Sequence, residues 1–579
     1  MRRALQGVPP SGVGTGPRAR RVVAAALPCF LLGVLAGGFA AAQSADDPFT
    51  PANRRAAEQI DADGLLAVVA EISADRYGGR APGTEGDEMT LEFLAGALER
   101  VGFEPGAADG TWRQPFDLVG ITARQPDAWT FSRGGERLDL DQGEEFIVAS
   151  GVQRERAAVD GAEVVFVGYG IEAPEHDWDD FKGADLEGKV LLMLNNDPDW
   201  DPELFGGPER LYYGRWTYKY ESAARQGAAG AIIIHTVPSS GYPWQVVQSS
   251  WTGTQYELPA GGEPRMQVEA WVTETAARDL VQLAGLELAD LADRAKRRDF
   301  EPVPLGVETS ITLENMLERT SSANVIGVLT GSDPELADEY VIYTAHHDHL
   351  GRTQDAAAGD TVYNGARDNA SGVGMVLEIG EAFAALPDPP RRSIMLLFVG
   401  AEEQGLLGSE FFARHPTVPP GKIAANVNYD SGNIWGETRD ITFVGLGKST
   451  LDEAASRVAQ FQERELKADE FVDQGYYYRS DQFNFAKIGV PAFYFRNGSD
   501  FVGRPEGWGL ERIDEYNNEH YHQPSDELTD AWSFDGMVQD ARFGFWAGLI
   551  VANADELPQW NPGDEFEAAR REAIEALRN

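Results

Sequence analysis

Residues 340–349 read YVIYTAHHDH, an apolar run that ends in three histidines around one aspartate. Residues 393–400 form a further apolar run and residues 425–429 a further expected strand, and both also end just before acidic side chains. Helix-like stretches at 372–386 and 408–415 separate these runs. Short apolar strands that alternate with helices predict a largely parallel sheet covered on both faces. We therefore expect an α/β fold with a mixed, mainly parallel sheet flanked by helices.

Acidic and histidine side chains gather at the expected carboxyl ends of these strands. The set comprises His346, Asp348, Asp368, Glu402, Glu403, Asp430 and His522. In such sheets the ligand site lies beyond the carboxyl ends of the strands. Five ligand-type side chains with a spare carboxylate are the inventory of a two-metal hydrolase, in which paired ions share a water and clamp a polarised carbonyl.

The pair Glu402-Glu403 follows a run that is apolar enough to be a buried strand. Two adjacent carboxylates at a buried strand end are costly without cations. One of them is therefore expected to bind metal, and the other to stay free as a general base. The spacing of His346 and Asp348 suits a ligand histidine whose second ring nitrogen is held by a carboxylate. The alternatives are a polar turn, a solvated glutamate pair and, for Asp368, a helix-capping role.

The N-terminus has the pattern of an export signal. Arg18, Arg20 and Arg21 precede an apolar run from Val22 to Ala42, which ends in three alanines. We expect residues 1–42 to be a signal peptide and the protein to be exported, to the periplasm or the medium. A twin-arginine signal and an uncleaved membrane anchor are the two alternatives. The single cysteine, Cys29, lies inside the apolar run, so the mature chain is predicted to lack disulfides and thiol catalysis.

Length and charge narrow the class of protein further. A chain of 579 residues is too long for one compact domain, and 42% hydrophobic residues are enough for a sizeable core. The net charge of -44 repels nucleic acid and anionic membranes. We expect no nucleic-acid partner, and membrane contact only through an uncleaved anchor. The sequence does not indicate an oligomeric state.

Three motifs in combination resemble the co-catalytic di-zinc aminopeptidase family, which includes bacterial leucyl aminopeptidases, aminopeptidase Y and glutamate carboxypeptidase II. They are AHHDHLG at 345–351, NGARDNASG at 364–372 and AEEQGLLGS at 401–409. Asn428–Asp430, Arg479–Asp481 and Tyr521–Asp526 continue the match in the expected order. Residues 166–235 resemble the β-rich protease-associated domain often inserted in this family.

The resemblance implies a domain organisation. Residues 43–155 would form the N-terminal part of the catalytic domain, 156–304 the smaller inserted protease-associated domain, and 305–579 the rest of the zinc peptidase domain.

The resemblance also implies a ligand set for two zinc ions per chain. One ion would be bound by His346 and Asp430, and the other by Glu403 and His522, with Asp368 bridging them. Glu402 matches the general base, Asp348 its supporting carboxylate, and Tyr521 a tyrosine that donates a hydrogen bond to the oxyanion. The family also often has a cis peptide bond at the position of Asp368-Asn369.

The implied activity is hydrolysis of N-terminal residues from peptide substrates, by a metal-bridged water with Glu402 as the base. Arg367 departs from the family pattern, because an acid is common at its position; a cation there would favour an acidic substrate group. Arg367, Arg479 and Arg496 keep a carboxypeptidase of the same clan open as an alternative. A glutaminyl cyclase-like enzyme and a non-catalytic binding protein are the others, although every expected metal ligand is present.

Overall fold

The computed structural model describes residues 47–202, 204–353 and 359–578. Residues 48–579 form one compact unit. The predicted signal peptide and Cys29 lie outside the described residues. Within the described part of the chain, no helix combines the length and the apolar character that a membrane span needs.

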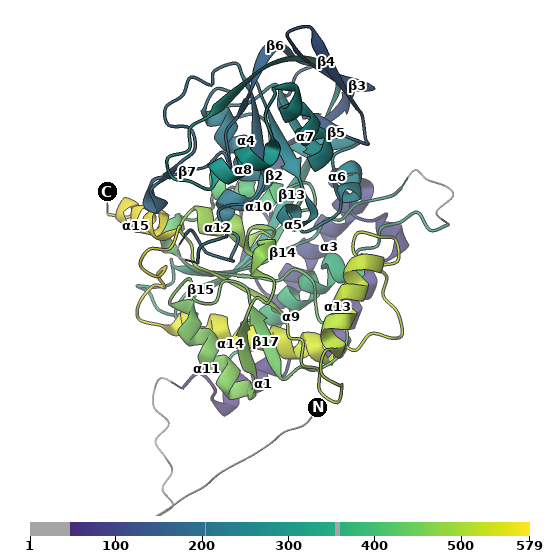
Figure 1. The fold of residues 1–579 in the computed structure, drawn as a ribbon. Helices are drawn as coiled ribbons and strands as arrows, with labels where there is room; N and C mark the ends of the chain where they lie inside the picture. The colour runs from purple at the N-terminus through teal and green to yellow at the C-terminus, as the bar shows by residue number, and fades with distance from the viewer. Residues whose placement is uncertain (1–46, 203, 354–358, 579) are drawn as a thin grey trace, which may run out of the picture. The chain divides into compact units, whose positions relative to one another are not determined.

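A mixed sheet forms the core of the C-terminal part of the chain (Figure 1). Its four parallel strands lie in the order β15 (Ser393–Val399), β14 (Tyr340–His346), β16 (Ile423–Asn428) and β19 (Ala492–Asn497). Strand β17 (Asp440–Phe443) pairs antiparallel with β19, and β18 (Glu465–Ala468) pairs parallel with β17. The prediction of a mainly parallel sheet in a mixed α/β fold is confirmed.

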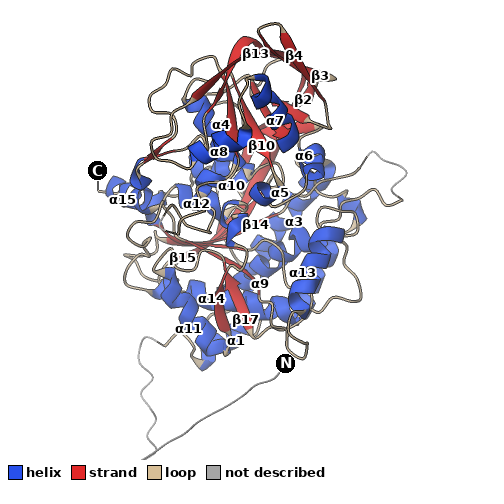
Figure 2. Cartoon of the chain, viewed as in Figure 1, coloured by secondary structure: helices blue, strands red, loops and turns tan. Residues whose placement is uncertain are grey.

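Helices cover both faces of this sheet (Figure 2). Helices α9 (Gly372–Ala384) and α14 (Asp535–Asn553) pack on one face, and α10 (Leu407–Arg414) and α12 (Gln482–Lys487) lie on the other. The side chains of β15 alternate between the two hydrophobic clusters that result. Ile394, Leu396 and Phe398 belong to the first, and Met395, Leu397 and Val399 to the second. A strand buried on both faces needs such an uninterrupted apolar sequence.

The N-terminal helices pack against the first of these faces. A helix-like pattern over residues 56–74 predicts one helix, but the structure has two, α1 (Pro51–Ala57) and α2 (Ala62–Ile72). The break arises at Asp61, whose Oδ1 accepts a hydrogen bond of 2.9 Å from the backbone N–H of Gly64 and so begins α2. The remaining helices of the catalytic part are α3 (Glu85–Val101), α11 (Leu451–Gln462), α13 (Trp508–Glu519) and α15 (Glu567–Ala576).

The longest strand, β13 (Val303–Leu329), is 27 residues long and takes part in several ladders in succession. Its first half pairs antiparallel with β6 (Arg156–Phe166) and with β3 (Ala128–Arg133). Residues 314–325 pair with β2 (Arg113–Arg124), and residues 325–329 pair with β15. One continuous backbone therefore belongs both to the catalytic sheet and to the β-rich region that precedes it.

The β-rich region has its own hydrophobic clusters, drawn from residues 129–313. Parallel strands β6, β9 (Val190–Leu194), β10 (Gly230–His235) and β12 (Val268–Thr273) lie next to one another, and β5 (Phe146–Ser150) pairs antiparallel with β12. Side chains of β3 and β5 share the cluster with those of residues 156–304. The boundaries of an inserted domain stay a prediction.

Several shorter elements complete this region. The helices are α4 (Trp216–Arg225), α5 (Val237–Ser240), α6 (Trp244–Ser250), α7 (Glu274–Leu283) and α8 (Leu288–Ala295). The remaining strands of the described chain are β1 (Glu104–Pro105), β4 (Glu136–Asp141), β7 (Glu172–Ala173), β8 (Trp178–Asp179) and β11 (Thr254–Glu257).

Candidate metal centre

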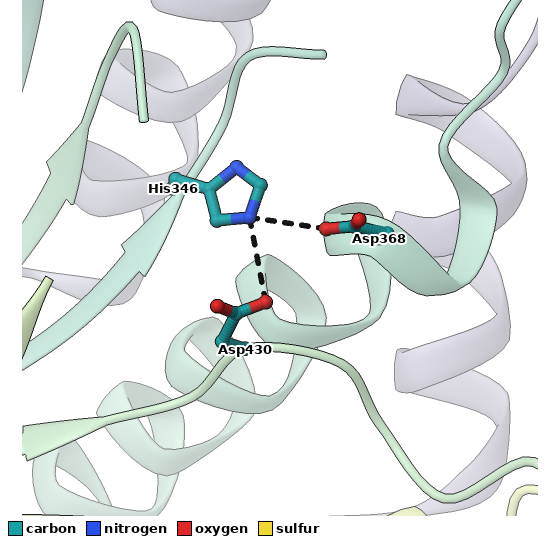
Figure 3. A group of neighbouring side chains, drawn as sticks. All are labelled: His346, Asp368 and Asp430. Atoms are coloured by element: carbon teal, nitrogen blue, oxygen red, sulfur yellow. Dashed lines mark ion pairs between the residues drawn. The ribbon is translucent and has the colours of Figure 1, made fainter. Parts of the chain in front are cut away.

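Three neighbouring parallel strands bring the predicted ligands to one edge of the sheet. His346 is the last residue of β14, Glu402 and Glu403 follow β15, and Asp430 follows β16. Figure 3 shows the carboxylates of Asp368 and Asp430 directed at the same ring nitrogen of His346. Its Nε2 atom lies 3.2 Å from Oδ1 of Asp368 and 3.5 Å from Oδ1 of Asp430.

A second group of side chains meets the other oxygen of Asp368. The Nε2 atom of His522 lies 3.3 Å from Oδ2 of Asp368 and 3.0 Å from Oε2 of Glu403. His522 comes from the turn after α13, where its φ of 58° places it in the left-handed region. The two carboxylate oxygens of Asp368 therefore face two different histidine–carboxylate pairs, as a bridging ligand must.

The donors fit zinc by chemistry and by spacing. Imidazole nitrogens and carboxylate oxygens about 2.0–2.2 Å from a tetrahedral ion lie roughly 3.3–3.5 Å from one another, close to the separations found here. The Nε2 atoms of His346 and His522 are buried, and no hydrogen-bond partner reaches them within the described residues. A cation at this place would satisfy both nitrogens and would offset the cost of the buried carboxylates.

Asp348 ties the end of β14 to the loop after β15. Its Oδ1 accepts a hydrogen bond from the backbone N–H of Glu402 at 3.0 Å, and its Oδ2 accepts one from that of Glu403 at 3.3 Å. Oδ1 also lies 3.7 Å from Nδ1 of His346. Asp348 is fully buried, so it holds the backbone of both glutamates from inside the protein.

The loop that carries Asp368 is fixed from two sides. Asp526 accepts hydrogen bonds from the backbone N–H groups of Arg367 (3.1 Å) and Asp368 (3.0 Å). Asn369 accepts from the backbone of Ser431 at 3.0 Å and donates to Tyr429 O at 2.9 Å, which connects the loop to the neighbourhood of Asp430. The peptide bond between Asp368 and Asn369 is cis, as the resemblance implies.

The electrostatics of the site follow from burial and close opposite charges. Burial lowers the pKa of His346, but Glu402, Asp348, Asp368 and Asp430 together outweigh it, and the pKa lies well above its ordinary value. Burial raises the pKa of Glu402 well above its ordinary value; the carboxylates of Asp430 and Glu403 add to this effect, while the imidazole of His346 opposes it. Burial and the neighbouring carboxylates thus favour the neutral form of Glu402.

Glu403 and His522 are shifted in opposite directions. Burial raises the pKa of Glu403, but the imidazoles of His522 and His349 outweigh it and lower the pKa to about 2. Burial lowers the pKa of His522, but Glu403 and Asp368 raise it to about 10. Glu403 is therefore the ionised member of the glutamate pair.

Sequence reasoning missed two residues that hold the centre together. Arg80, 1% exposed, donates from Nε to His347 O at 2.9 Å, from Nη1 to Ile72 O and Asn364 O, and from Nη2 to Gly365 O. His349, which is fully buried, contacts Glu403 through Nδ1. The turn-rich sequence around Arg80 carries no signal of this role, whereas the position of His349 in the histidine cluster carries one.

Tyr521 and Arg367 take different positions relative to the centre. Tyr521 is 46% exposed, and its ring stacks on that of His522 with centroids 3.8 Å apart. Arg367 is buried, donates from Nε to Gly432 O at 2.9 Å and lies over the rings of Tyr516 and Trp435. The guanidinium of Arg367 is thus engaged by the protein itself.

Residues 324–540 match the model of Peptidase family M28. All predicted ligands lie inside this segment. The candidate metal centre thus lies in a segment that is similar to peptidase family M28.

Three comparisons illustrate the extent of the likeness. The chain is 37% identical over 239 residues to Aminopeptidase NAALADL1 of Rattus norvegicus, which covers 33% of this chain and 30% of the relative. It is 27% identical over 237 residues to Aminopeptidase YwaD of Bacillus subtilis (strain 168), which covers 40% and 45% respectively. The chain therefore spans less than half of the length of either relative. Among solved structures, an aminopeptidase from Aneurinibacillus sp. strain AM-1 is 17% identical, with 87% and 97% covered and a TM-score of 0.49.

Proposed function

We propose that this chain is an exported di-zinc aminopeptidase. The observation that carries the proposal is the position of Asp368, whose two carboxylate oxygens face two separate pairs of histidine and carboxylate. The match of residues 324–540 to peptidase family M28 and the aminopeptidase names of the relatives support the reaction class. Export rests on the pattern of residues 1–42 in the sequence.

The proposed ligands divide into two sets that share one residue. His346 and Asp430 would hold one zinc ion, and Glu403 and His522 the other, with Asp368 common to both. When bound, the ions would polarise the scissile carbonyl and lower the pKa of the attacking water.

In this proposal Glu402 acts as the general base. Its Oε2 lies 4.0 Å from Nε2 of His346, and its backbone N–H is held by Asp348, so the carboxylate faces the centre without being part of either ligand pair. In the proposed reaction Glu402 takes a proton from the attacking water and gives it to the leaving amine. Asp348 positions Glu402, and the hydroxyl of Tyr521 donates a hydrogen bond to the oxyanion.

The test compares a short peptide with its N-acetylated twin, each incubated with the metal-loaded protein and followed by mass spectrometry. Stepwise loss of residues from the free N-terminus only, abolished by a chelator and restored by zinc, is the expected result. Loss of residues from the C-terminus of both peptides would replace the proposal with a carboxypeptidase. Zinc content measured on the same samples, with two ions expected per chain, checks the stoichiometry.

A further inference from the structure

Arg367 stands where the resemblance leads us to expect an acid, and its side chain lies against two aromatic rings. The guanidinium carbon lies 4.1 Å from the centroid of the Tyr516 ring and 4.7 Å from that of the Trp435 ring. Arg367 is only 3% exposed. Contacts between a cation and an aromatic ring are strongest where water is excluded, so the protein itself fixes this guanidinium group.

The hydrogen bonds of Arg367 reach the loop that carries Asp430. Its Nε donates to Gly432 O at 2.9 Å, and its Nη2 donates to Oδ1 of Asn497 at 3.4 Å. Gly432 lies two residues after Asp430, and Asn497 is the last residue of β19. Arg367 also directly precedes Asp368 in the chain. One side chain therefore joins the loop of the bridging carboxylate to the loop that holds a ligand of the first proposed zinc ion.

The backbone of Tyr516 makes the corresponding connection to the second proposed ion. Its carbonyl oxygen accepts hydrogen bonds of 2.9 Å from the backbone N–H groups of His520 and Tyr521. These bonds lie where α13 ends and the turn that carries His522 begins. The position of Tyr516 therefore sets the start of the turn that presents this ligand.

The hydroxyl of Tyr516 reaches the bridging ligand through one carboxylate. It donates to Oδ2 of Asp526 at 3.1 Å. The same Oδ2 atom accepts from the backbone N–H of Asp368 at 3.0 Å, and Oδ1 of Asp526 accepts from that of Arg367 at 3.1 Å. Tyr516 and Asp526 are both buried, so loss of the hydroxyl would leave this carboxylate with one donor fewer and no water to replace it.

Two carboxylates offset the charge of Arg367 from within the protein. Burial lowers the pKa of Arg367 and the charge of Arg496 lowers it further, while Tyr516, Asp526 and Asp368 oppose them. The guanidinium thus has its aromatic, hydrogen-bonding and charged partners inside the chain. This arrangement favours a positioning role over the contact with an acidic substrate group that the sequence suggested.

We propose that Arg367 and Tyr516 are positioning residues that hold the ligands of both zinc ions in one arrangement, so that loss of either residue weakens both ions. The proposal rests on the di-zinc function, and both residues lie outside the two ligand sets. Arg367 holds the side of Asp430, Tyr516 holds the side of His522, and the contact of the guanidinium with the Tyr516 ring joins the two sides. Groups that orient metal ligands strengthen metal binding.

Competition between the zinc-loaded protein and a chromophoric chelator tests the proposal without any peptide. In Tyr516→Phe, which keeps the ring and removes only the hydroxyl, the affinity for each of the two ions should fall by about tenfold. In Arg367→Gln, which removes the cation, the affinity for each ion should fall by about 10–100-fold. Arg367→Lys, which keeps the charge without the planar group, should lie between wild type and Arg367→Gln.

The visible spectrum of the cobalt-substituted protein reports the arrangement of the ligands. Co²⁺ in place of zinc should give absorption bands whose position or intensity differs from wild type in Tyr516→Phe and in Arg367→Gln. A role in overall stability alone would leave the bands of the folded protein unchanged. Circular dichroism of the same samples shows that each variant is folded.

Arg54 provides the matched control for Arg367. Its guanidinium carbon also lies over an aromatic ring, 4.7 Å from the centroid of Phe461, and its Nε also donates to a backbone carbonyl, that of Phe49 at 2.9 Å. Arg54 is exposed on α1 and belongs to no part of the centre. Arg54→Gln is expected to keep the zinc affinities and the cobalt bands of wild type.

Tyr256 provides the control for Tyr516. Its hydroxyl also donates to a carboxylate, that of Glu318, but it lies on β11 in the β-rich region. Tyr256→Phe should bind both ions like wild type. If Arg367→Gln does not fold, Tyr516→Phe and Arg367→Lys still decide the matter.

Unchanged zinc affinities and unchanged cobalt bands in the folded variants would overturn the proposal. A fall in affinity confined to one of the two ions would overturn it as well, because the network would then hold one ion only. Neither result would touch the aminopeptidase function, which the peptide and its N-acetylated twin test separately. Weakened binding of both ions in a protein that hydrolyses neither peptide would remove the proposed function alone.

Discussion

The Nδ1 atom of His349 lies 2.6 Å from Oε1 of Glu403, while Oε2 of the same carboxylate lies 3.0 Å from Nε2 of His522. His349 is fully buried, so it holds Glu403 from inside the protein. The contact fixes which oxygen of Glu403 faces the proposed ion. Groups that hold metal ligands in this way set their orientation and strengthen binding.

Replacement of His349 should weaken zinc binding without removing a ligand. His349→Leu keeps a similar side-chain size but has no donor for Oε1 of Glu403, so the zinc affinity is expected to fall by about 10–100-fold. Competition with a chromophoric chelator measures this affinity directly. The exposed His415 is the control, and His415→Leu should bind zinc like wild type. Unchanged affinity in His349→Leu would show that the contact with Glu403 is dispensable.

Replacement of Glu402 should abolish turnover and leave zinc in place. Glu402→Gln removes the proposed base, and kcat is expected to fall by about 10²–10⁴-fold. Zinc content by mass spectrometry should match wild type, because Glu402 belongs to neither ligand pair. Glu410→Gln, on α10, is the matched control for a glutamate that pairs only with Arg414. Zinc lost along with activity would make Glu402 a ligand rather than the base.

Arg80 should contribute strongly to stability. Its guanidinium donates to four backbone carbonyls, two of them in the loop before Asp368 and one in His347. Arg80→Met leaves these buried acceptors without a donor and is expected to cost about 3 kcal/mol or more. The thermal midpoint measures the loss. Arg76→Met, which removes an exposed pair with Glu71 and a contact with the ring of Tyr77, should change stability by less than about 1 kcal/mol. Equal midpoints for the two variants would contradict the role of Arg80.

Glu378 should make stability depend on pH. It is 4% exposed on α9, and burial raises its pKa to about 7. A carboxyl group with a raised folded pKa stabilises most fully below its unfolded pKa of about 4.5, and this contribution is lost as the pH rises through about 7. Relative to Glu378→Gln, which keeps an acceptor for the backbone N–H of Asp61, wild type should therefore lose roughly 2 kcal/mol between pH 4.5 and 8.

Thermal midpoints measured across this pH range for both proteins give the comparison. The exposed Glu92→Gln variant should follow wild type at every pH. A wild-type curve parallel to that of Glu378→Gln would show that folding does not raise the pKa of Glu378.

The central strands could be predicted because the residue types of each strand indicate that it is buried. β14, β15 and β16 are buried almost throughout, and β14 and β15 are mostly apolar, whereas β16 also contains Asn426 and Asn428; a ligand-type side chain stands at or just beyond the end of each strand. The candidate ligands could be predicted for a related reason. Neighbouring parallel strands place their carboxyl ends at one edge of the sheet, so the polar residues at those ends lie close together. His522 lies far along the chain, and only the combined motifs indicated its part.

Other features depend on contacts between residues that the sequence pattern does not reveal. Arg80 reaches His347 across 267 positions, and its turn-rich surroundings are typical of many surface loops. The sequence does not predict β13 as one strand, because its first half alternates buried and exposed residues while its last part is mostly buried. The single predicted helix over 56–74 misses its break because the apolar spacing continues across it, whereas the cap at Asp61 is local.

The length of β13 limits how the molecule can move. From Glu308 to Leu329 this strand pairs with one neighbour after another, so any bend between the β-rich region and the catalytic sheet would break backbone pairs with β2. We therefore expect access to the centre to change through surrounding loops, such as the one that carries Tyr521, and not through rotation of the β-rich region. Because β13 belongs to both, heat or denaturant should unfold the β-rich region and the catalytic sheet in one cooperative transition.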